Sequence, residues 1–188
     1  MKEMAISTKV NGIEVERLFQ TIDAIKQSPR LADFKFRLQN RWIKSAVNRS
    51  TIKNFYGTSK ENQHQEPFVL DSDEPVVLLG QESAPSPVEY LLHALAACVT
   101  SALVYHAAAR GIQLQEVESR LEGEIDLHGF LGLDDNVRRG YKNIKIKFRI
   151  KADVPDEQLE ELCRLGPIYS PVFDSITRGV PVEVSLEK

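Results

Sequence analysis

The sequence predicts an α+β fold built around one long apolar helix. The first observation is the stretch from residue 90 to residue 109, which contains no Asp, Glu, Lys or Arg. The second is the alternation of apolar and polar residues on both sides of that stretch, which is typical of half-buried strands. Strands, then a long helix, then further strands are the element order of an α+β protein.

The long helix is expected to span about residues 87 to 110. Ser86 fits the N-cap, Pro87 the first helical position and Glu89 the third, so that Ser86 and Glu89 can form a capping box. Gly111 fits the stop, because helices commonly end at a glycine in the left-handed conformation.

This helix is long enough to cross a bilayer, which takes about 20 apolar residues. Four polar residues interrupt it, namely His93, Thr100, Ser101 and His106. No aromatic belt and no cluster of Lys and Arg marks a membrane interface at either end. We therefore expect a helix that protein covers on several sides, not a membrane span.

Before this helix the patterns change from helical to extended. An amphipathic helix is expected over residues 11 to 27, where apolar residues recur at helical spacing. Strand signals follow in KFRLQNRWI, in STIKNFYG and in EPFVLDSDEPVVLLG, whose two apolar runs are broken at residues 71 to 75. The polar stretch from Thr58 to Gln65 is the best candidate for a mobile loop.

After the central helix, residues 116 to 128 and 141 to 151 are expected to form a pair of strands. Residues 129 to 140 combine turn residues with mixed charge, which indicates an exposed loop between them. A helix is expected from residue 156 to Gly166, followed by a turn or short helix in SPVFDSI. A closing strand is predicted by the alternating apolar residues Val180, Val182, Val184 and Leu186.

The composition is that of an ordinary soluble protein. The formal net charge of −3 leaves no basic excess, so we expect no nucleic-acid partner. The first residues include acidic side chains and no apolar core of signal-peptide length, so we expect a cytoplasmic protein. The two cysteines, Cys98 and Cys163, are too few for a disulfide framework. Neither has a second Cys or His at metal-ligand spacing, and we expect no metal and no cofactor.

Two phrases, SPVEYLLHALAACV and PIYSPVFDSITRGVPVEV, resemble the two signatures of the osmotically inducible protein C and organic hydroperoxide resistance (OsmC/Ohr) family. DSDEPVVLLG resembles an OsmC-like branch of that family. The resemblance covers residues 34 to 188 and leaves residues 1 to 33 as an amino-terminal helical extension. It implies an OsmC-like fold, with antiparallel sheets around the central helix. It also implies an interlocked homodimer whose active sites each draw on both chains.

The resemblance further implies thiol-dependent reduction of organic hydroperoxides in defence against oxidative stress. Cys98 matches the peroxidatic cysteine, whose thiolate attacks the peroxide and becomes a sulfenic acid. The family's resolving cysteine falls at Ser170, and serine cannot form a disulfide. Cys163 could substitute only if its Cβ lies within about 4.5 Å of that of Cys98. Otherwise an external thiol reductant must resolve the sulfenic acid.

Two further positions depart from the family's pattern. The family's glutamate after the proline falls at Val88, and Glu89 stands one residue later, where a capping role explains it at least as well as catalysis. The catalytic arginine comes from a glycine-rich turn that NRWIKSAVNRST lacks. Arg49 is the first choice and Arg41 the second. A guanidinium is needed there because it would stabilise a thiolate or hold a carboxylate or the peroxide oxygen.

Ser101 and Tyr105 lie three and seven residues after Cys98, which puts them on the same helix face, where they could line a pocket. Two hypotheses follow. The first is a peroxidase that uses the single cysteine Cys98. The second is a non-catalytic OsmC-like protein that binds a lipid-like or other apolar small molecule at the dimer interface. The loss of the cysteine at Ser170 and of the glutamate at Val88 favours the second hypothesis.

Overall fold

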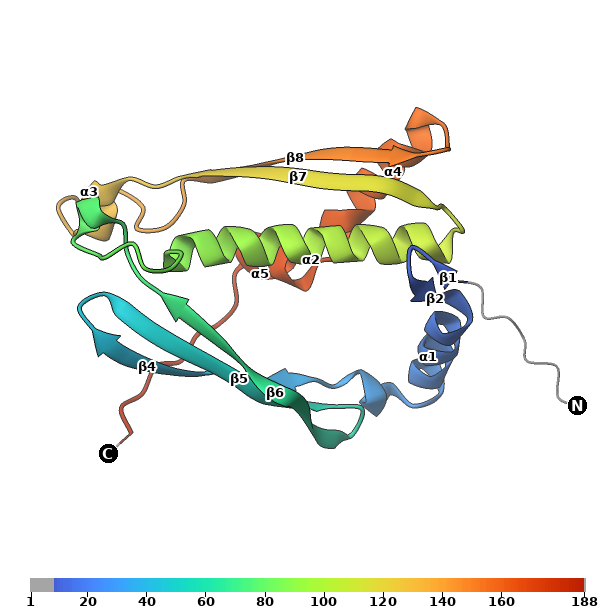
Figure 1. Ribbon diagram of the computed structural model, residues 1–188, viewed down its shortest axis with the longest axis horizontal. Helices are drawn as coiled ribbons and strands as arrows, with labels where there is room; N and C mark the ends of the chain where they lie inside the picture. Colours follow the sequence, from blue (N-terminus) through green and yellow to red (C-terminus); the bar gives the residue numbers. More distant parts are fainter. Residues whose placement is uncertain (1–8, 188) are drawn as a thin grey trace, which may run out of the picture. The chain divides into compact units, whose positions relative to one another are not determined.

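The computed structural model describes residues 9–187, which form two compact units (Figure 1). The amino-terminal unit contains residues 14–91, and the carboxyl-terminal unit contains residues 9–13 and 92–187. The long helix α2 (Pro87–Ala109) begins in the first unit and continues in the second. The predicted α+β class is confirmed, because antiparallel sheets and a long apolar helix are both present. The predicted domain boundary at residue 33 stays a prediction.

The amino-terminal unit contains a four-stranded antiparallel sheet. Its central strand is β5 (Val47–Gly57). The long strand β6 (Lys60–Ser72) pairs along one side of β5. The shorter strands β3 (Lys35–Phe36) and β4 (Gln39–Lys44) follow one another along its other side. The outer edges of β4 and β6 carry no further strand among residues 9–187.

The prediction of a mobile loop from Thr58 to Gln65 is wrong. Thr58 and Ser59 form a tight turn with φ angles of 52° and 61°. The chain then enters β6 at once, where Asn62 pairs with Phe55 of β5. Two central residues with positive φ match the twist of a two-residue hairpin, so the polar stretch continues the sheet.

The first helix, α1 (Val15–Gln27), begins later than the predicted residue 11. Asn11 and Gly12 instead form a turn with φ angles of 53° and 77°. This turn joins the short strands β1 (Lys9–Val10) and β2 (Ile13–Glu14). Asn-Gly favours such a hairpin because both residues tolerate positive φ. A short 3₁₀ turn, η1 (Pro29–Ala32), ends the helical region before the sheet.

Asp73 organises the loop that joins β6 to α2. Its carboxylate is fully buried and accepts hydrogen bonds from the backbone nitrogens of Ser83, Glu74 and Gln81, at 3.0, 2.8 and 3.1 Å, and from Ser83 Oγ at 2.8 Å. These bonds, chiefly those from Ser83, lower the pKa of Asp73 to about 2. The loop folds around this carboxylate, so the second apolar run forms the 3₁₀ turn η2 (Val76–Leu78) and not the expected strand.

The predicted strand pair after α2 is confirmed. β7 (Leu114–Glu124) and β8 (Asn143–Ala152) are antiparallel, with Val117 opposite Ile150. A single helical turn, α3 (Leu127–Phe130), and a largely exposed loop connect them. The inner face of the hairpin packs on a core formed by Leu103, Ala107, Ile112 and Leu162.

Two helices follow β8, and no closing strand does. α4 (Asp156–Ile168) passes the predicted stop at Gly166 by two residues, and α5 (Pro171–Arg178) confirms the predicted short helix. Residues 179–187 form neither helix nor strand, so the predicted strand from Val180 to Leu186 is wrong for the single chain. An alternating segment becomes a strand only beside another strand, and none of the described strands of this chain pairs with it.

The predicted central helix is confirmed in α2. Glu89 N donates to Ser86 Oγ at 3.4 Å, and Ser86 N donates to Glu89 Oε2 at 2.8 Å, so the capping box forms. Gly111 follows the helix with a φ of 72°. In residues 9–187, α2 is the one helix that is long and apolar enough to cross a membrane, a property that core helices of soluble proteins share.

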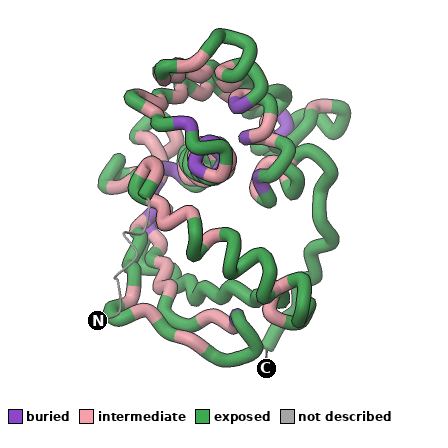
Figure 2. The backbone as a smooth tube through the Cα atoms, turned by 90° about the vertical axis from the view of Figure 1, so that its right-hand side faces the viewer, coloured by how far each residue is buried: buried purple, intermediate pink, exposed green. Residues whose placement is uncertain are grey.

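The expectation that protein covers α2 on several sides is wrong for the single chain. The buried residues lie mainly along one stripe of the helix, at Leu95, Val99, Leu103, Ala107 and Ala108. Other apolar side chains are exposed, including Leu91 at 39% and Tyr105 at 51%. Figure 2 shows how few segments of the whole tube are buried. An apolar helix with one covered stripe leaves apolar surface that a single chain does not bury.

Candidate functional site

Cys98 lies near the middle of α2 as a half-buried free thiol. Val99, the next residue, belongs to the buried stripe, which turns the Cys98 side chain partly away from the core. Ser101 is exposed and Tyr105 is 51% exposed. Both follow Cys98 at the helical spacing that puts them on its face. The thiol is therefore accessible at the edge of the buried stripe and has two hydroxyl groups on its own helix face.

α4 approaches α2 closely at the residue next to Cys98. A Cβ added at Gly166 would lie 2.9 Å from Val99 Cγ1 and 3.0 Å from the backbone oxygen of Val99. Only a glycine leaves room for this approach, because any larger residue would overlap the backbone of α2. Gly166, which the sequence predicts as a helix stop, therefore allows α4 to lie against α2, the helix that carries Cys98.

A second contact joins the same two segments further along α2. The rings of His106 and Tyr169 have centroids 4.2 Å apart. Burial, and then the positive charge of Arg110, lower the pKa of His106, which favours the neutral imidazole. Arg110 Nη1 lies 3.3 Å from His106 Nδ1, and Arg110 also forms an ion pair with Glu161 of α4 at 3.4 Å. Two points of contact therefore fix the end of α4 along α2.

Ser170, at the family's resolving position, caps α5. Its side chain is buried, and Ser170 Oγ accepts a hydrogen bond from Phe173 N at 3.1 Å. Serine is a favoured N-cap because its oxygen satisfies a free backbone N–H of the first turn. Cys163 is a half-buried free thiol beside Leu162 of the core. Cys98 and Cys163 are not joined by a disulfide.

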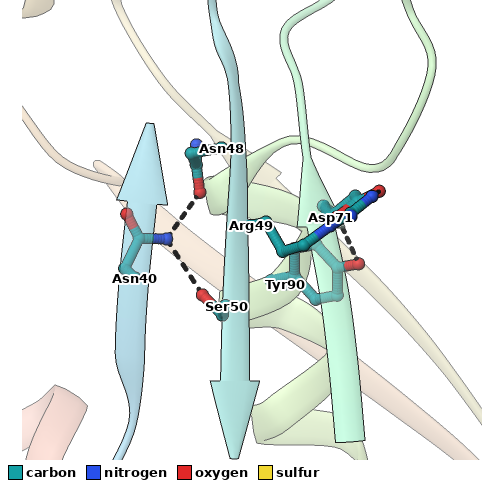
Figure 3. A network of polar contacts seen from close by, with 6 residues as sticks. All are labelled: Asn40, Asn48, Arg49, Ser50, Asp71 and Tyr90. Atoms are coloured by element: carbon teal, nitrogen blue, oxygen red, sulfur yellow. Dashed lines mark hydrogen bonds and ion pairs between the residues drawn. The ribbon is translucent and has the colours of Figure 1, made fainter. Parts of the chain in front are cut away.

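In the amino-terminal unit, Arg49 forms a bidentate ion pair with Asp71 (Figure 3). Arg49 Nε lies 2.6 Å from Asp71 Oδ1, and Arg49 Nη2 lies 2.7 Å from Asp71 Oδ2. These side-chain hydrogen bonds, more than the charges, raise the pKa of Arg49 and lower that of Asp71. Arg41, the second candidate, pairs directly with Arg49 in the sheet and is exposed.

Asp71 also holds the first turn of α2 through its main chain. Tyr90 Oη donates a hydrogen bond to the carbonyl oxygen of Asp71 at 2.8 Å (Figure 3).

A second polar contact joins β4 to β5. Asn40 Nδ2 donates to Asn48 Oδ1 and Ser50 Oγ, at 2.8 and 3.0 Å. Strands β4 and β5 are thus tied by amide contacts, and β5, β6 and the start of α2 are tied through one aspartate.

Glu89 acts as a capping residue. Glu89 Oε2 accepts hydrogen bonds from the backbone nitrogen and the hydroxyl of Ser86, at 2.8 and 2.9 Å. The same contacts, the backbone bond first, lower the pKa of Glu89. Val88, where the family's glutamate falls, is 40% exposed. Arg49 and Glu89 belong to the amino-terminal unit, whereas Cys98, Cys163 and Ser170 belong to the other.

Sequence reasoning missed Asp71 as the carboxylate that holds the candidate arginine. Its position could have been found from the strand pairing, because Asp71 directly follows the apolar run FVL of one strand and Arg49 lies in the neighbouring one. A register cannot be read from one strand alone, so the pair emerges only in the sheet. Within residues 9–187, no group of three or more His, Cys, Asp or Glu side chains is arranged to hold a metal ion.

The fold and the thiol site together define an α+β protein with a free cysteine on its long helix. A family model described as OsmC-like protein matches residues 80–185, a segment that contains Cys98, Cys163 and Ser170. The chain belongs to the OsmC-like family. None of the curated proteins matches the sequence.

Solved structures of low sequence identity share the fold. An OsmC-like protein from Mycoplasma pneumoniae is 16% identical, with a TM-score of 0.58, over 78% of this chain and 89% of that one. An organic hydroperoxide resistance protein OsmC from Legionella pneumophila is also 16% identical, with a TM-score of 0.50, over 76% and 90% of the two chains. An OsmC-like protein of unknown function from Vibrio cholerae is 12% identical, with a TM-score of 0.50, over 76% and 94%.

Proposed function

We propose that the protein reduces organic hydroperoxides by thiol chemistry at Cys98, in oxidative-stress defence in the cytoplasm. The observation that carries this proposal is the half-buried free thiol of Cys98, within the segment that matches the OsmC-like family. The fold shared with the hydroperoxide resistance protein from Legionella pneumophila adds support. No metal or other cofactor is needed, because a thiolate is itself a sufficient nucleophile for a peroxide.

The first step is an attack of the Cys98 thiolate on the distal peroxide oxygen. An S–O bond forms while the O–O bond breaks, and the departing alkoxide takes up a proton to become an alcohol. The sulfur is oxidised to a sulfenic acid and the peroxide is reduced. Ser101 and Tyr105, on the same helix face, are the proposed pocket hydroxyls near the reacting oxygen.

The sulfenic acid is then resolved by an external thiol. Ser170 has no sulfur and caps α5, so it takes no part in a disulfide. The external thiol forms a mixed disulfide with Cys98 and releases water, and a second thiol reduces that disulfide. Cys163 lies on α4, and a disulfide between Cys163 and Cys98 is the competing route of resolution. The variant Cys163→Ser blocks this route.

The proposed arginine is Arg49, whose guanidinium would stabilise the thiolate and the departing alkoxide. Asp71 supports the choice of Arg49 over Arg41 because it holds the Arg49 guanidinium in a bidentate pair. We assign to Asp71 the orienting role that the family gives to the glutamate replaced by Val88. The Glu89 carboxylate already accepts two hydrogen bonds from Ser86, which favours capping over catalysis for Glu89.

We also propose that the working protein is an interlocked homodimer whose sites draw on both chains. Its support is apolar surface that one chain leaves open. α2 buries little more than one stripe although it is apolar all round. On the sheet of the amino-terminal unit, neighbouring rings in one row have centroids 4.9 to 6.2 Å apart, and Phe36 within the row is 81% exposed. The row consists of Phe34, Phe36, Phe55, His64 and Phe68.

The experiment that tests the chemistry is intact-mass spectrometry after one equivalent of cumene hydroperoxide, with a sulfenic-acid trap present. We expect the trap on Cys98 in the native protein and in Cys163→Ser, and no adduct in Cys98→Ser. Trapping that is equal in Cys98→Ser and the native protein would contradict the proposal. If the native protein forms a Cys98–Cys163 disulfide and no trapped adduct, the resolving thiol is Cys163 and not an external thiol.

The second candidate function is binding of an apolar small molecule without turnover. It is favoured by Ser170, whose buried hydroxyl caps a helix where the family has a redox cysteine. In this case the thiol stays unmodified by the hydroperoxide pulse. Native mass spectrometry of the purified protein would then show a bound lipid-like molecule.

A further inference from the structure

The outward face of the β7–β8 hairpin carries a ladder of charged side chains. Alternation along the strands turns Val117, Phe148 and Ile150 toward the core, so the charged residues of both strands share the opposite face. Side chains directly opposite each other in an antiparallel pair have Cβ atoms about 4.5–5.5 Å apart, and opposite charges at this distance stabilise the sheet. Each rung of the ladder is therefore expected to combine an acid with a base.

Three of the rungs that carry a charge on both strands follow this rule. They join Glu116 to Lys151, Glu118 to Arg149 and Glu122 to Lys145. An ion pair forms across every one of them. The remaining rung breaks the rule, because Arg120 lies directly opposite Lys147. Like charges in this position destabilise a sheet. A local rule that is broken at one place in a regular pattern is typical of a functional site.

The carboxylate beside the broken rung does not balance its two cations. Arg120 Nη2 lies 3.6 Å from Glu118 Oε1, while Arg149 Nη1 lies 3.3 Å from Glu118 Oε2. Arg120 therefore shares this carboxylate with Arg149. Lys147 is exposed and forms no ion pair among residues 9–187. The charge of Lys147 is left without a counterion in the chain.

The surface is hollowed at the same rung. Two adjoining depressions, of about 200 and 350 Å³, have Arg120 and Lys147 in common among their lining residues. Glu118 lines the first depression and Glu122 lines the second. These two carboxylates flank Arg120 along β7 and repel an anion on either side of the rung. An anion therefore has one favourable place, between Arg120 and Lys147.

We propose that the Arg120–Lys147 rung binds a phosphate group, carried either by inorganic phosphate or by a small phosphorylated metabolite. The Arg120 guanidinium offers two parallel N–H donors for two phosphate oxygens, and the Lys147 ammonium donates to a third from the opposite strand. A dianion between the two cations replaces their repulsion by two attractions. A single carboxylate balances only one of the two charges, which favours phosphate as the ligand class. The inference goes beyond the proposed peroxidase and does not depend on it.

The test is an amide NMR titration of the full-length protein with inorganic phosphate and, in parallel, with glycerol phosphate. The ionic strength is held at about 0.1 M, where the Debye length is about 10 Å. We expect saturable shifts confined to the amides of residues 118–122 and 145–149. Lys147→Gln should weaken binding about fivefold, which corresponds to the loss of one exposed ion pair. The variant Cys98→Ser should titrate like the native protein, so a failure of the peroxidase proposal leaves this result standing.

Lys151→Gln is the matched control. It removes the same charge from the same face of β8, at a rung where Glu116 already balances it. Position 151 lies about 13 Å along the strand from position 147, beyond the Debye length, so the affinity should stay within about twofold of native. Equal affinity in Lys147→Gln and the native protein would overturn the inference, as would shifts that do not saturate. Tighter binding of glycerol phosphate would identify a phosphorylated metabolite as the ligand, and equal binding the free anion.

Urea unfolding gives a second readout with Lys147→Glu, which restores an opposite charge to the rung. Without phosphate, the urea midpoint of this variant should exceed that of the native protein. Added phosphate should raise the midpoints of native protein and Lys151→Gln more than that of Lys147→Glu, because a ligand stabilises only the chain that binds it. The general stabilisation by phosphate acts on all three proteins alike. Equal gains in the three proteins would contradict the site, and a lower midpoint for Lys147→Glu would show that the native rung costs nothing.

Discussion

Arg49 and Asp71 face each other across β5 and β6 in a two-point ion pair, with distances of 2.6 and 2.7 Å. Both side chains are partly exposed, at 47% and 37%, so water screens the attraction and the pair adds little to stability. Its value is geometric, because two parallel hydrogen bonds fix the plane of the guanidinium. A lysine at the same place would keep the charge and lose this orientation.

The first prediction concerns this orientation. Arg49→Lys should lower the rate of hydroperoxide consumption by about a hundredfold, the usual effect of removing one preorganised donor from a reacting oxygen. The thermal midpoint should change little, because the pair is screened by water. The measurement is the rate of cumene hydroperoxide loss with a dithiol reductant in excess.

Arg41→Lys is the matched control for this experiment, since Arg41 lies directly opposite Arg49 on the neighbouring strand. Its rate should stay within about twofold of the native value, as for most exposed substitutions. Equal losses in the two variants would show that the bidentate pair with Asp71 has no special role.

The second prediction restores the missing resolving group. Ser170→Cys should cost about 1 kcal/mol of stability, because the N-cap bond to Phe173 N is lost. After one equivalent of hydroperoxide, this variant should gain a disulfide with Cys98 in place of a trappable sulfenic acid. Intact-mass spectrometry without reductant should show the disulfide as a mass lower by two hydrogens than that of the reduced variant. A trapped sulfenic acid that persists unchanged would mean that position 170 does not reach the thiol.

The third prediction follows from the buried carboxylate of Asp73. Its pKa of about 2 lies below the usual value of about 3.9 in an unfolded chain. The unfolded state therefore takes up a proton first as the pH falls, so the stabilising effect is complete above about pH 4 and is lost towards pH 2. Asp73→Asn should lower the urea midpoint at pH 7 and flatten its decline between about pH 4 and pH 2.

The control for Asp73 is the exposed carboxylate Asp153. Asp153→Asn should leave the urea midpoint at pH 7 close to native, because substitutions of exposed residues usually change stability little. An acid profile of Asp73→Asn that parallels the native one would show that other carboxylates carry the effect.

The fourth prediction tests the close approach at Gly166. Gly166→Ala adds helix propensity worth about 1 kcal/mol but puts a methyl group against the backbone oxygen of Val99, which cannot move aside. Overpacking should dominate and destabilise the protein by about 1–3 kcal/mol. Urea unfolding measures the change, and labelling of the Cys98 thiol should become faster as the helices separate.

Gly140→Ala is the control for this substitution, because the nearest heavy atom to its new Cβ, Arg138 Nε, is 3.8 Å away. Its stability should stay near native. A Gly166→Ala variant that is as stable as native, with an unchanged labelling rate, would show that α4 can shift on α2 without cost.

The elements with local signals were predictable from the sequence. The capping box at Ser86 and Glu89 and the glycine at residue 111 define α2 through neighbours in the chain, and those contacts form as expected. The period-two pattern of β7 and β8 likewise predicts their pairing, since a half-buried strand shows its inner face in its own residues. The two OsmC-like phrases predicted the family that the family model identifies.

The remaining features depend on residues that are distant in sequence. Thr58 to Gln65 looked like a loop because a polar sequence does not reveal whether a partner strand lies beside it. Val180 to Leu186 looked like a strand, although none of the described strands pairs with it. The pairing of Arg49 with Asp71 required the register of two strands. Sequence alone determined the ends of α2, the inner faces of β7 and β8 and the position of the thiol. Only the tertiary structure decided which carboxylate meets which arginine and which apolar surfaces one chain leaves uncovered, because these depend on contacts between segments.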